Sequence, residues 1–352
     1  MSGLLPHARF TSDWSRTRVV FDVGAVKQLA AELDTLHVTR LLIVTTPGRA
    51  PMLGVVHEHL GARVRGVCDL AALHVPIDRV QAAVTMIDAI GPDALLAIGG
   101  GSAIGLAKAM ARERRLPIAV VPTTYAGSEM TSIWGVTDGD AKRTGRDPAV
   151  APRLVVYDPT VTLSLPPSVS AASGMNAIAH AVEALYALEV GPIATAAAEA
   201  ALRSLARALP AVVARPDDIE ARTLALGGAH AAGVALELAS MGLHHKICHV
   251  LGGTFGLPHA PTHAAVLPRV VAFNAAAAPA AVARVAAALD VADAAAGLEA
   301  LNRTLGLTMS LSALGLRAGD VDRAATLVAS STYPNPRQVT VDDVRALLRS
   351  AL

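Results

Sequence analysis

The sequence predicts two domains, an α/β domain built on a parallel sheet and an all-helical domain after it. Up to about residue 160, short aliphatic runs alternate with segments of helical periodicity, which is the pattern of βαβ units. After Leu165-Pro166-Pro167 the strand-like runs stop, and long Ala- and Leu-rich segments of 3.6-residue periodicity follow. The 352 residues are enough for each domain to bury its own core. We therefore expect the α/β domain at residues 1–160 and the helical domain at residues 161–352.

Composition indicates a well-packed globular protein and argues against several classes of function. Hydrophobic residues make up 53% of the chain, aromatic residues only 3%, and the net charge is +1, so a nucleic-acid-binding face is not expected. Cys68 and Cys248 are too few for a disulfide framework, and we expect two reduced thiols. The sequence has no apolar run of membrane-spanning length, and residues 1–14 lack the apolar stretch of a signal peptide. A cytoplasmic protein is expected.

Six short runs are typical of buried parallel strands. They are rich in Val, Ile, Leu and Ala, and the segments between them are long enough for crossover helices. The run RLLIVT leads through Pro47 and Gly48 into a helical pattern, and the run ALLAI leads into a glycine turn and a helix at 103–112. In a parallel sheet such turns meet at one edge. The predicted strands are residues 18–21, 40–45, 62–67, 94–98, 118–121 and 154–157, and the predicted long helices of the second domain include 194–209 and 280–301.

The turn Gly99-Gly100-Gly101-Ser102 joins a predicted strand to a predicted helix. Glycine allows backbone N–H groups to approach a ligand closely, and a helix N-terminus favours an anion. Three glycines can also form an ordinary surface turn, but the strand–turn–helix context favours a phosphate site. We therefore predict that Gly99, Gly100, Gly101 and Ser102 bind the pyrophosphate of a dinucleotide.

Hydroxyl side chains follow the neighbouring predicted strands. We expect Thr123, Thr124 and Ser128 to hydrogen-bond the ribose or the nicotinamide, although an ordinary Ser/Thr-rich turn is the alternative. At the end of the strand at 40–45, where dinucleotide folds often have an acidic residue for the adenosine ribose, the chain has Thr46. Because a carboxylate that would repel a 2′-phosphate is missing there, the predicted cofactor is NADH, with NADPH also accepted.

Histidines are concentrated in one part of the second domain. Five of the twelve fall within twenty residues, and an Asn176/His180 pair precedes them. Imidazole both ligates transition metals and exchanges protons near neutral pH, so this concentration nominates a reactive site. The five are His244, His245, His249, His259 and His263.

Helical spacing predicts how these side chains come together. Ser173-Gly174 is expected to begin a helix that carries Asn176 and His180 on one face. The spacing of four residues recurs between His245 and His249, on a helix expected to end at Gly252-Gly253, and His259 would follow in a new turn. Three elements can therefore direct imidazoles toward one cavity.

Four motifs together resemble the iron-activated (group III) alcohol dehydrogenase superfamily across almost the whole chain. They are GGGS after a strand, PTT…GSE, SGMNAIAHAVEAL and HHKICHVLGG…LPH. PTTYAGSE is one residue shorter than the superfamily's PTTAGTGSE, so individual hydroxyl contacts there stay open. In that superfamily an Asp and three His bind a divalent metal, and the matching positions here are Asn176, His180, His245 and His259.

The carboxylate of the superfamily is thus replaced by the neutral amide of Asn176, which would bind a dication more weakly. The replacement matches the maleylacetate reductase branch, which the chain resembles most in Gly174-Met175-Asn176-Ala177 and in LHHKICH, and which is understood to work without metal. This resemblance implies an NAD(P)H-dependent homodimeric enzyme of aromatic-compound catabolism. Its dicarboxylate substrate, maleylacetate, would be reduced at the conjugated double bond to 3-oxoadipate.

In such a reaction hydride adds to the alkene carbon distal to the ketone, and negative charge develops on the ketone oxygen. We expect His180, His245 and His259 to stabilise this oxygen from beside Asn176. Protonation of the enolate carbon is assigned to His249 or to His245 itself, because the usual pKa of imidazole suits proton donation at neutral pH.

The two substrate carboxylates need cationic partners. Lys246 is the nearest candidate in sequence and Arg337 a more distant one, although both could be ordinary surface charges. His244 is expected to point away from His245 and to be structural, and His263 to reach at most the rim of the pocket.

Two alternatives stay open at this point. One is a metal-dependent alcohol or polyol dehydrogenase of the same superfamily, in which His180, His245 and His259 hold iron or zinc. The other is a nucleotide-binding sensor without catalytic activity, in which Asn176 would be the inactivating change. A dehydroquinate synthase is disfavoured, because its phosphorylated substrate needs many cations and the histidine region holds only Lys246.

Overall fold

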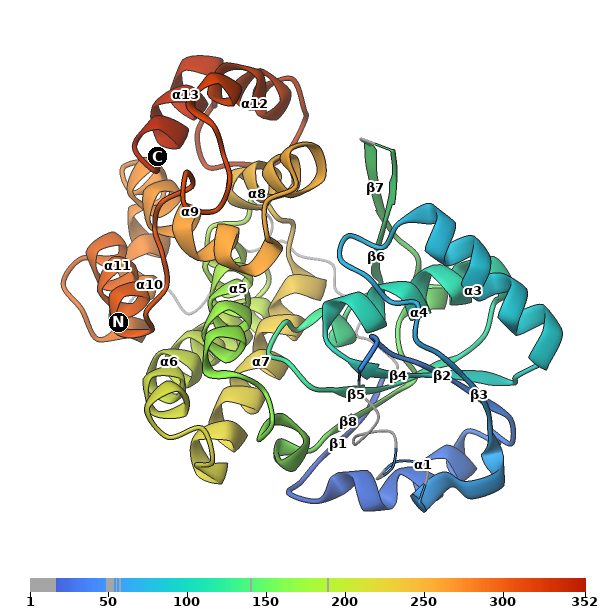
Figure 1. The fold of residues 1–352 in the computed structure, drawn as a ribbon. Coiled ribbons are helices and arrows are strands. Elements are labelled where there is room, and N and C mark those ends of the chain that lie inside the picture. The colour runs from blue at the N-terminus through green and yellow to red at the C-terminus, as the bar shows by residue number, and fades with distance from the viewer. Residues whose placement is uncertain (1–16, 49–53, 55, 57, 140, 189) are drawn as a thin grey trace. The chain divides into compact units, whose positions relative to one another are not determined.

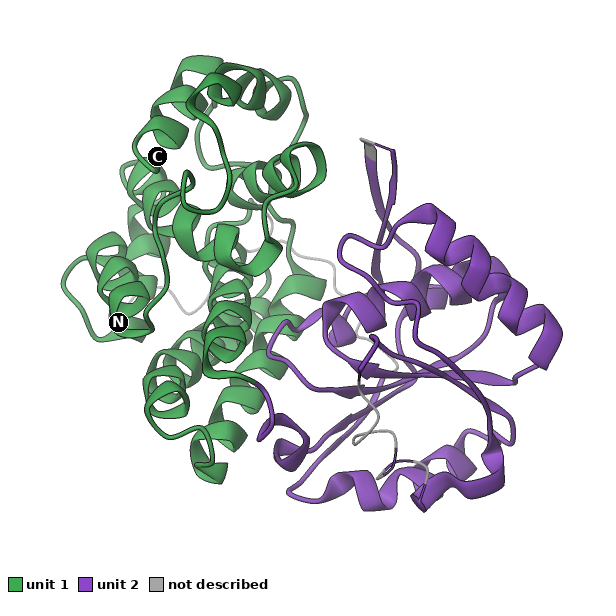
Figure 2. Ribbon diagram, in the orientation of Figure 1, with its two compact units in different colours: residues 1–13, 166–352 green, residues 14–165 purple. Residues whose placement is uncertain are grey.

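The computed structural model describes residues 17–48, 54, 56, 58–139, 141–188 and 190–352. These residues form two compact units that divide between Leu165 and Pro166. We call them in chain order the first unit, which is purple and labelled unit 2 in Figure 2, and the second unit, which is green and labelled unit 1. The sequence prediction about the polar N-terminus lies outside the described residues. The helix expected after Gly48 is described only in part, and residues 54, 56 and 58–60 are helical. Among the described helices none alone is long and apolar enough to cross a membrane. Within the described part of the chain, one pair of helices, α7 (Ile219–Leu238) and α8 (Leu243–Phe255), reaches that length and composition when taken together, and the pair is bent by 101°.

The first unit is built on a six-stranded sheet in which all neighbours are parallel. Every residue of the strands β2, β4, β5 and β8 is buried, which explains their nearly uninterrupted aliphatic sequences. All six strands predicted from the sequence are present, and the predicted fold class is confirmed. In spatial order the strands are β1 (Arg18–Phe21), β8 (Leu154–Tyr157), β5 (Ile118–Pro122), β4 (Ala94–Gly99), β2 (Leu41–Val44) and β3 (Val64–Cys68).

Helices cover both faces of this sheet (Figure 1). Leu29 and Leu33 of α1 (Leu29–Thr35) pack with Leu96 and Ile98 of β4 in one hydrophobic core. The opposite face is covered by α3 (Ile77–Ile90) and α4 (Gly101–Arg114). Short 3-10 helices occupy several connections, at Ala25–Gln28 (η1), Gly61–Arg63 (η2), Ser128–Met130 (η3), Pro148–Val150 (η4) and Pro159–Thr162 (η5).

One element of this unit is missing from the sequence prediction. The strands β6 (Ile133–Asp138) and β7 (Ala141–Arg146) form an antiparallel hairpin of their own. Polar residues and glycines interrupt its sequence, and the residues of β6 are mostly half-buried. A hairpin of this kind lacks the continuous apolar run by which the buried strands were recognised.

The second unit consists of helices packed around α5, which is buried along almost its whole length from Ser170 to Leu185. Small side chains make this possible. A Cβ atom at Gly174 would lie 2.4 Å from Leu209 Cδ2 of α6, so any larger residue there would displace the Leu209 side chain. The helices are α5 (Pro167–Leu185), α6 (Pro192–Ala214), α7 (Ile219–Leu238), α8 (Leu243–Phe255), α9 (His259–Asn274), α10 (Pro279–Leu289), α11 (Ala294–Thr304), α12 (Val321–Ala329) and α13 (Val341–Arg349), with a short 3-10 helix, η6 (Ala318–Asp320).

Three predicted helix boundaries were wrong. The expected helix at 280–301 is two helices, because Asp290 is left-handed at φ 56° and Asp293 caps α11 through the Ala296 N–H at 2.7 Å. The helix that carries Asn176 begins at Pro167, and Ser173-Gly174 lies inside it. The next histidine helix continues through Gly252-Gly253 and ends at the left-handed Gly256. In both cases packing overrides the weak helix propensity of glycine.

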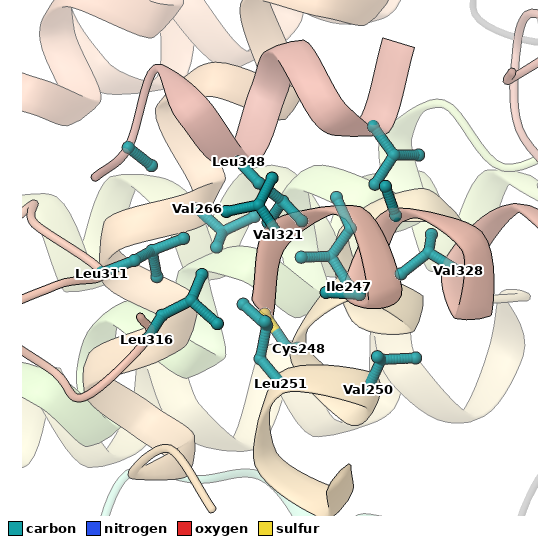
Figure 3. Packing of buried hydrophobic residues seen from close by; sticks show 14 of the residues in the cluster. Ile247, Cys248, Val250, Leu251, Val266, Leu311, Leu316, Val321, Val328 and Leu348 are labelled. Atoms are coloured by element: carbon teal, nitrogen blue, oxygen red, sulfur yellow. The ribbon is translucent and has the colours of Figure 1, made fainter. Parts of the chain in front are cut away.

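A hydrophobic core joins α8 to α9, α12 and α13 (Figure 3). Ile247 and Leu251 of α8 are fully buried in it. Because His245 and His249 are about half a turn away from these two residues on the helix, this packing sets the direction in which the imidazoles project.

Candidate active site

The predicted phosphate turn joins β4 to α4 in the first unit. Gly99 has φ 150° and Gly100 is the N-cap residue of α4. A Cβ atom at Gly100 would lie 2.6 Å from Cγ2 and 2.7 Å from Oγ1 of Thr124. The bare glycine backbone therefore lets the hydroxyl-bearing loop after β5 pack directly against the start of α4.

The order β5-β4-β2 brings the predicted cofactor residues to neighbouring strand ends. The Thr123 N–H donates to Gly99 O at 2.9 Å, while Thr123 Oγ1 and Ser128 Oγ are buried and have no hydrogen-bond partner among the described residues. Thr46 follows the end of β2 beside them. Ligands of open α/β sheets bind at the carboxyl ends of neighbouring strands, beside the point where the strand order reverses. The geometry is suited to a dinucleotide.

The second unit gathers the predicted histidines from α5, α8 and α9. His180 of α5 stacks on His245 of α8, with ring centroids 4.9 Å apart and an interplanar angle of 23°. The ring centroid of His249 lies 6.1 Å from that of His245 and 6.4 Å from that of His259, the first residue of α9. All four histidines of the predicted set therefore lie in one continuous group of rings.

His263, which the sequence placed at most at the rim, lies in the middle of this group. It is fully buried, and its ring is 4.5 Å from that of His259, 4.9 Å from that of His245 and 6.4 Å from that of His180. The prediction was wrong because His263 is one turn beyond His259 on α9, which places both rings on the same face.

His244 also differs from its prediction. Its ring does not point away from the site but lies 5.3 Å from that of His245, and His244 Nε2 is hydrogen-bonded to His263 Nδ1 at 2.9 Å. One ring donates and the other accepts, so each fixes the tautomer of the other. We define the histidine cluster as His180, His244, His245, His249, His259 and His263.

Sequence reasoning missed Glu183, the carboxylate behind this cluster. It is fully buried on α5, and its Oε2 accepts from His245 Nδ1 at 2.6 Å. Its two oxygens also accept from the backbone N–H groups of Gly242 at 3.0 Å, His244 at 2.9 Å and His245 at 3.3 Å, at the N-terminus of α8. The signal was present, since Glu183 lies three residues after His180 on the same helical face.

The surroundings of Glu183 determine its charge. Burial alone would raise the pKa of Glu183, but the hydrogen bond from His245, the neighbouring imidazoles and the N–H of Gly242 bring it below its usual value. The carboxylate is therefore ionised and holds His245 as an Nδ1–H donor, which leaves His245 Nε2 as the nitrogen without a partner among the described residues.

The other buried rings are neutral. Burial lowers the pKa of His180 and His263 well below the usual value and that of His244 to about 3, and the neighbouring rings add to each decrease. His180 Nδ1 and His263 Nε2 are buried without a hydrogen-bond partner among the described residues. Neutral imidazoles of this kind can donate an N–H to a developing negative charge without carrying a charge themselves.

The donor atoms at the histidine cluster are poorly matched to a metal ion. Asn176 Oδ1 is buried and has no described partner, but it is uncharged. Glu183 is already saturated by N–H groups. The three imidazoles whose ligand atoms lie within 4.8 Å of one another are His244, His245 and His263, and two of these are hydrogen-bonded to each other. The described residues therefore offer no anionic ligand, and this donor set does not fit iron, which is commonly held by carboxylate together with imidazole.

The two predicted substrate cations differ in their surroundings. Lys246 is half-buried on α8, forms no ion pair with the described residues, and partial burial lowers its pKa. Arg337 stacks over the ring of Phe273 at 4.2 Å and lies 3.9 Å from Asp343. The guanidinium of Arg337 thus already contacts an aromatic ring and a carboxylate, whereas the ammonium of Lys246 could bind a substrate carboxylate.

A second buried polar group, also missed in the sequence, lies in the first unit. Glu129 Oε1 accepts from the Tyr157 hydroxyl at 2.8 Å, and burial raises the pKa of Glu129 to about 7. Lys108 of α4 is 1% exposed and donates to four oxygens of the segment after β5. Nothing in the sequence indicated these contacts, because Lys108 and Glu129 each bind residues that are distant from them in the chain.

Comparison with known proteins identifies the family. The sequence profile of "Iron-containing alcohol dehydrogenase" matches residues 16–159, and that of "Fe-containing alcohol dehydrogenase family, C-terminal" matches residues 170–352. The chain belongs to the iron-containing alcohol dehydrogenase family. Its members include the maleylacetate reductases of Sphingobium indicum, 47% identical over 98% of this chain and 97% of that one, and of Burkholderia cepacia, 47% identical over 95% of both. The chain is accordingly an oxidoreductase.

Solved structures of this family share the fold. The maleylacetate reductase of Agrobacterium tumefaciens superposes with a TM-score of 0.93 at 41% identity, covering 98% of this chain and 99% of that one. A 1,3-propanediol oxidoreductase superposes with a TM-score of 0.91 at 25% identity, covering 98% and 100%. The predicted resemblance to this family, and to its maleylacetate reductases, is confirmed.

Proposed function

We propose that this oxidoreductase reduces maleylacetate to 3-oxoadipate with NADH or NADPH and requires no metal ion. The observation that carries the proposal is the replacement of the family's metal-binding carboxylate by Asn176, beside a histidine cluster in which the carboxylate of Glu183 already accepts hydrogen bonds from N–H groups. Full-length similarity to maleylacetate reductases at 44–47% identity supports the substrate.

The histidine cluster supplies what the chemistry needs in place of a metal. Hydride from the nicotinamide adds to the alkene carbon distal to the ketone, and the electron pair of the double bond moves toward the ketone oxygen as an enolate. Neutral N–H donors held in a water-poor site stabilise such an oxygen by a few kcal/mol each, about 3 kcal/mol in comparable sites. We assign this role to the N–H groups of His180 and His259, and to the Nε2–H that His245 carries only when its ring is doubly protonated, because its Nδ1–H is bound to Glu183.

A proton must then reach the carbon next to the ketone. His245 is suited to deliver it, because ionised Glu183 holds its Nδ1–H and stabilises the protonated ring. His249, one turn further along α8, is the second candidate. Lys246, half-buried and without a carboxylate among the described residues, is positioned on the same helix to bind one end of the dicarboxylate.

The test is to follow NADH oxidation with maleylacetate before and after exhaustive chelation with EDTA, using simple alcohols with NAD as the control reaction. Undiminished turnover of maleylacetate and none of the alcohols is expected. Loss of activity that returns on adding iron or zinc would instead support a metal-dependent alcohol dehydrogenase. Nucleotide binding without any turnover would support a sensor.

A further inference from the structure

A buried lysine connects the phosphate turn to the loop that carries the cofactor hydroxyls. Lys108 lies on α4, two helical turns after Gly101, and is 1% exposed. Its Nζ donates to Ser128 O at 2.6 Å, Thr131 O at 2.7 Å, Thr131 Oγ1 at 2.9 Å and Ile133 O at 3.0 Å. All four oxygens belong to residues 128–133, which we call the Lys108-bound segment.

These contacts resemble the coordination of a cation by backbone carbonyls. Between the single turn of η3 and Ile133, where β6 begins, the Lys108-bound segment has no regular structure, so few of its carbonyls have partners in a helix or sheet. Burying carbonyl groups without donors is costly, and burying an ammonium without acceptors is more so. Each therefore satisfies the other. Thr131 completes the arrangement, since its Oγ1 accepts from Lys108 and donates to Ser128 O at 3.0 Å.

The Lys108-bound segment begins at one of the predicted cofactor residues. Ser128 Oγ is buried and has no described hydrogen-bond partner, and neither has Thr123 Oγ1 at the other end of the same loop. A second contact holds the segment from the sheet, where the Tyr157 hydroxyl donates to Glu129 at 2.8 Å. The hydroxyls are thus presented by a loop whose shape depends on buried polar contacts rather than on secondary structure.

We propose that Lys108 is a positioning residue for the nicotinamide cofactor. Its ammonium fixes the Lys108-bound segment against α4, the helix whose N-terminus forms the phosphate turn. The hydroxyls of Thr123, Thr124 and Ser128 are thereby held in register with that turn. The inference rests on the proposed use of NAD(P)H and adds to it a residue that does not itself touch the cofactor. It assigns Lys108 to binding of the nucleotide rather than to hydride or proton transfer.

The experiment measures NADH binding by its fluorescence, without substrate, in the full-length protein. Lys108→Met should raise the Kd for NADH by about tenfold or more, while kcat at saturating NADH changes by less than about threefold. Thr131→Val removes one acceptor with little change in volume and should raise Kd in the same direction. Thr131→Ser keeps the hydroxyl and should restore binding, which a purely steric role of Thr131 would not explain.

Met110→Ala is the matched control for stability. Met110 is fully buried on the same helix and forms no hydrogen bond to the Lys108-bound segment. The substitution should lower the melting temperature and leave the Kd for NADH within about twofold of the original value. An equal rise of Kd in Met110→Ala and Lys108→Met would overturn the proposal, because general destabilisation would then account for both.

Two further outcomes are distinguishable. If the unaltered protein binds no NADH, the proposed function fails at its first step. If it binds NADH and Lys108→Met and Thr131→Val bind equally well, only the positioning role of Lys108 is refuted. Should Lys108→Met fail to fold, the comparison of Thr131→Val with Thr131→Ser decides the question.

Discussion

His245 Nδ1 donates to Glu183 Oε2 over 2.6 Å, and both side chains are almost entirely buried. The two residues come from different helices, 62 positions apart in the chain. The same carboxylate accepts from the first N–H groups of the helix that carries His245. One buried anion therefore caps α8, selects the tautomer of its key histidine and fixes that ring beside His180.

Glu183→Gln should lower kcat for maleylacetate by about ten- to a hundredfold and leave the Kd for NADH unchanged. The amide nitrogen of glutamine would oppose His245 Nδ1–H, so the ring would turn or exchange tautomers. Steady-state kinetics and NADH fluorescence measure the two effects, and the melting temperature shows whether the variant is folded. Unchanged kcat in a folded variant would remove Glu183 from the mechanism.

Asn176→Asp should increase the affinity for divalent zinc or iron by at least about tenfold, because it adds an anionic ligand beside imidazoles. Metal content after dialysis against the ion, followed by a chelator of known affinity, measures the change. Asn176→Ala is the neutral control, and its affinity for zinc or iron should not increase. A tightly bound stoichiometric ion in the unaltered protein, essential for turnover, would contradict the proposed metal-free mechanism.

Gly100→Ala should weaken NADH binding by about tenfold or more, because its Cβ would lie 2.6 Å from Thr124 Cγ2 and push the hydroxyl loop away from the phosphate turn. Gly101→Ala is the comparison, since its added Cβ would meet no atom within 4 Å. Fluorescence titration of both variants distinguishes the two positions. Equal losses would mean that the contact between Gly100 and Thr124 is unimportant.

NADPH should be used at a rate comparable with NADH, because no carboxylate follows β2 at Thr46. Thr46→Asp would place a negative charge where the 2′-phosphate is expected, and should lower kcat/KM for NADPH at least about tenfold more than that for NADH. The ratio of the two kcat/KM values measures this. A preference of several orders of magnitude for NADH in the unaltered protein would refute the prediction.

Stability should fall as the pH is lowered below about 6.5. His180, His244 and His263 have pKa values below 6.5 in the folded protein, chiefly because they are buried, whereas the unfolded chain binds protons on them as soon as the pH falls below that value. Each ring then removes up to about 1.4 kcal/mol of unfolding free energy per pH unit.

Glu183 also lowers the unfolding free energy in acid, but only below about pH 4.5, where the unfolded chain binds a proton on this carboxylate more readily than the folded protein does. Urea unfolding at pH 7.5, 6.5 and 5.5 measures the histidine effect separately. His244→Phe, which removes one of the three rings, should show a shallower dependence over this range. If the unfolding free energy of His244→Phe depended on pH as steeply as that of the unaltered protein, His244 would not contribute to the pH dependence.

Much of the architecture can be predicted from the sequence because it depends on local patterns. Buried parallel strands such as Ala94–Gly99 are continuous aliphatic runs, and the spacing of His245 and His249 places them on one helical face whatever surrounds the helix. The β6–β7 hairpin and the exact helix ends escaped prediction, because polar strands lack such a pattern and glycines inside α5 and α8 are tolerated for packing reasons.

The sequence by itself therefore determined the fold class, the family, the glycine turn between β4 and α4, and the helices that carry the histidines. Only the tertiary structure decided which side chains meet: that Glu183 rather than Asn176 supplies the buried negative charge at His245, that His263 lies in the middle of the cluster, and that Lys108 binds the segment after Ser128. These contacts join residues far apart in the chain. They depend on how each helix is rotated by its hydrophobic core, which no local pattern encodes.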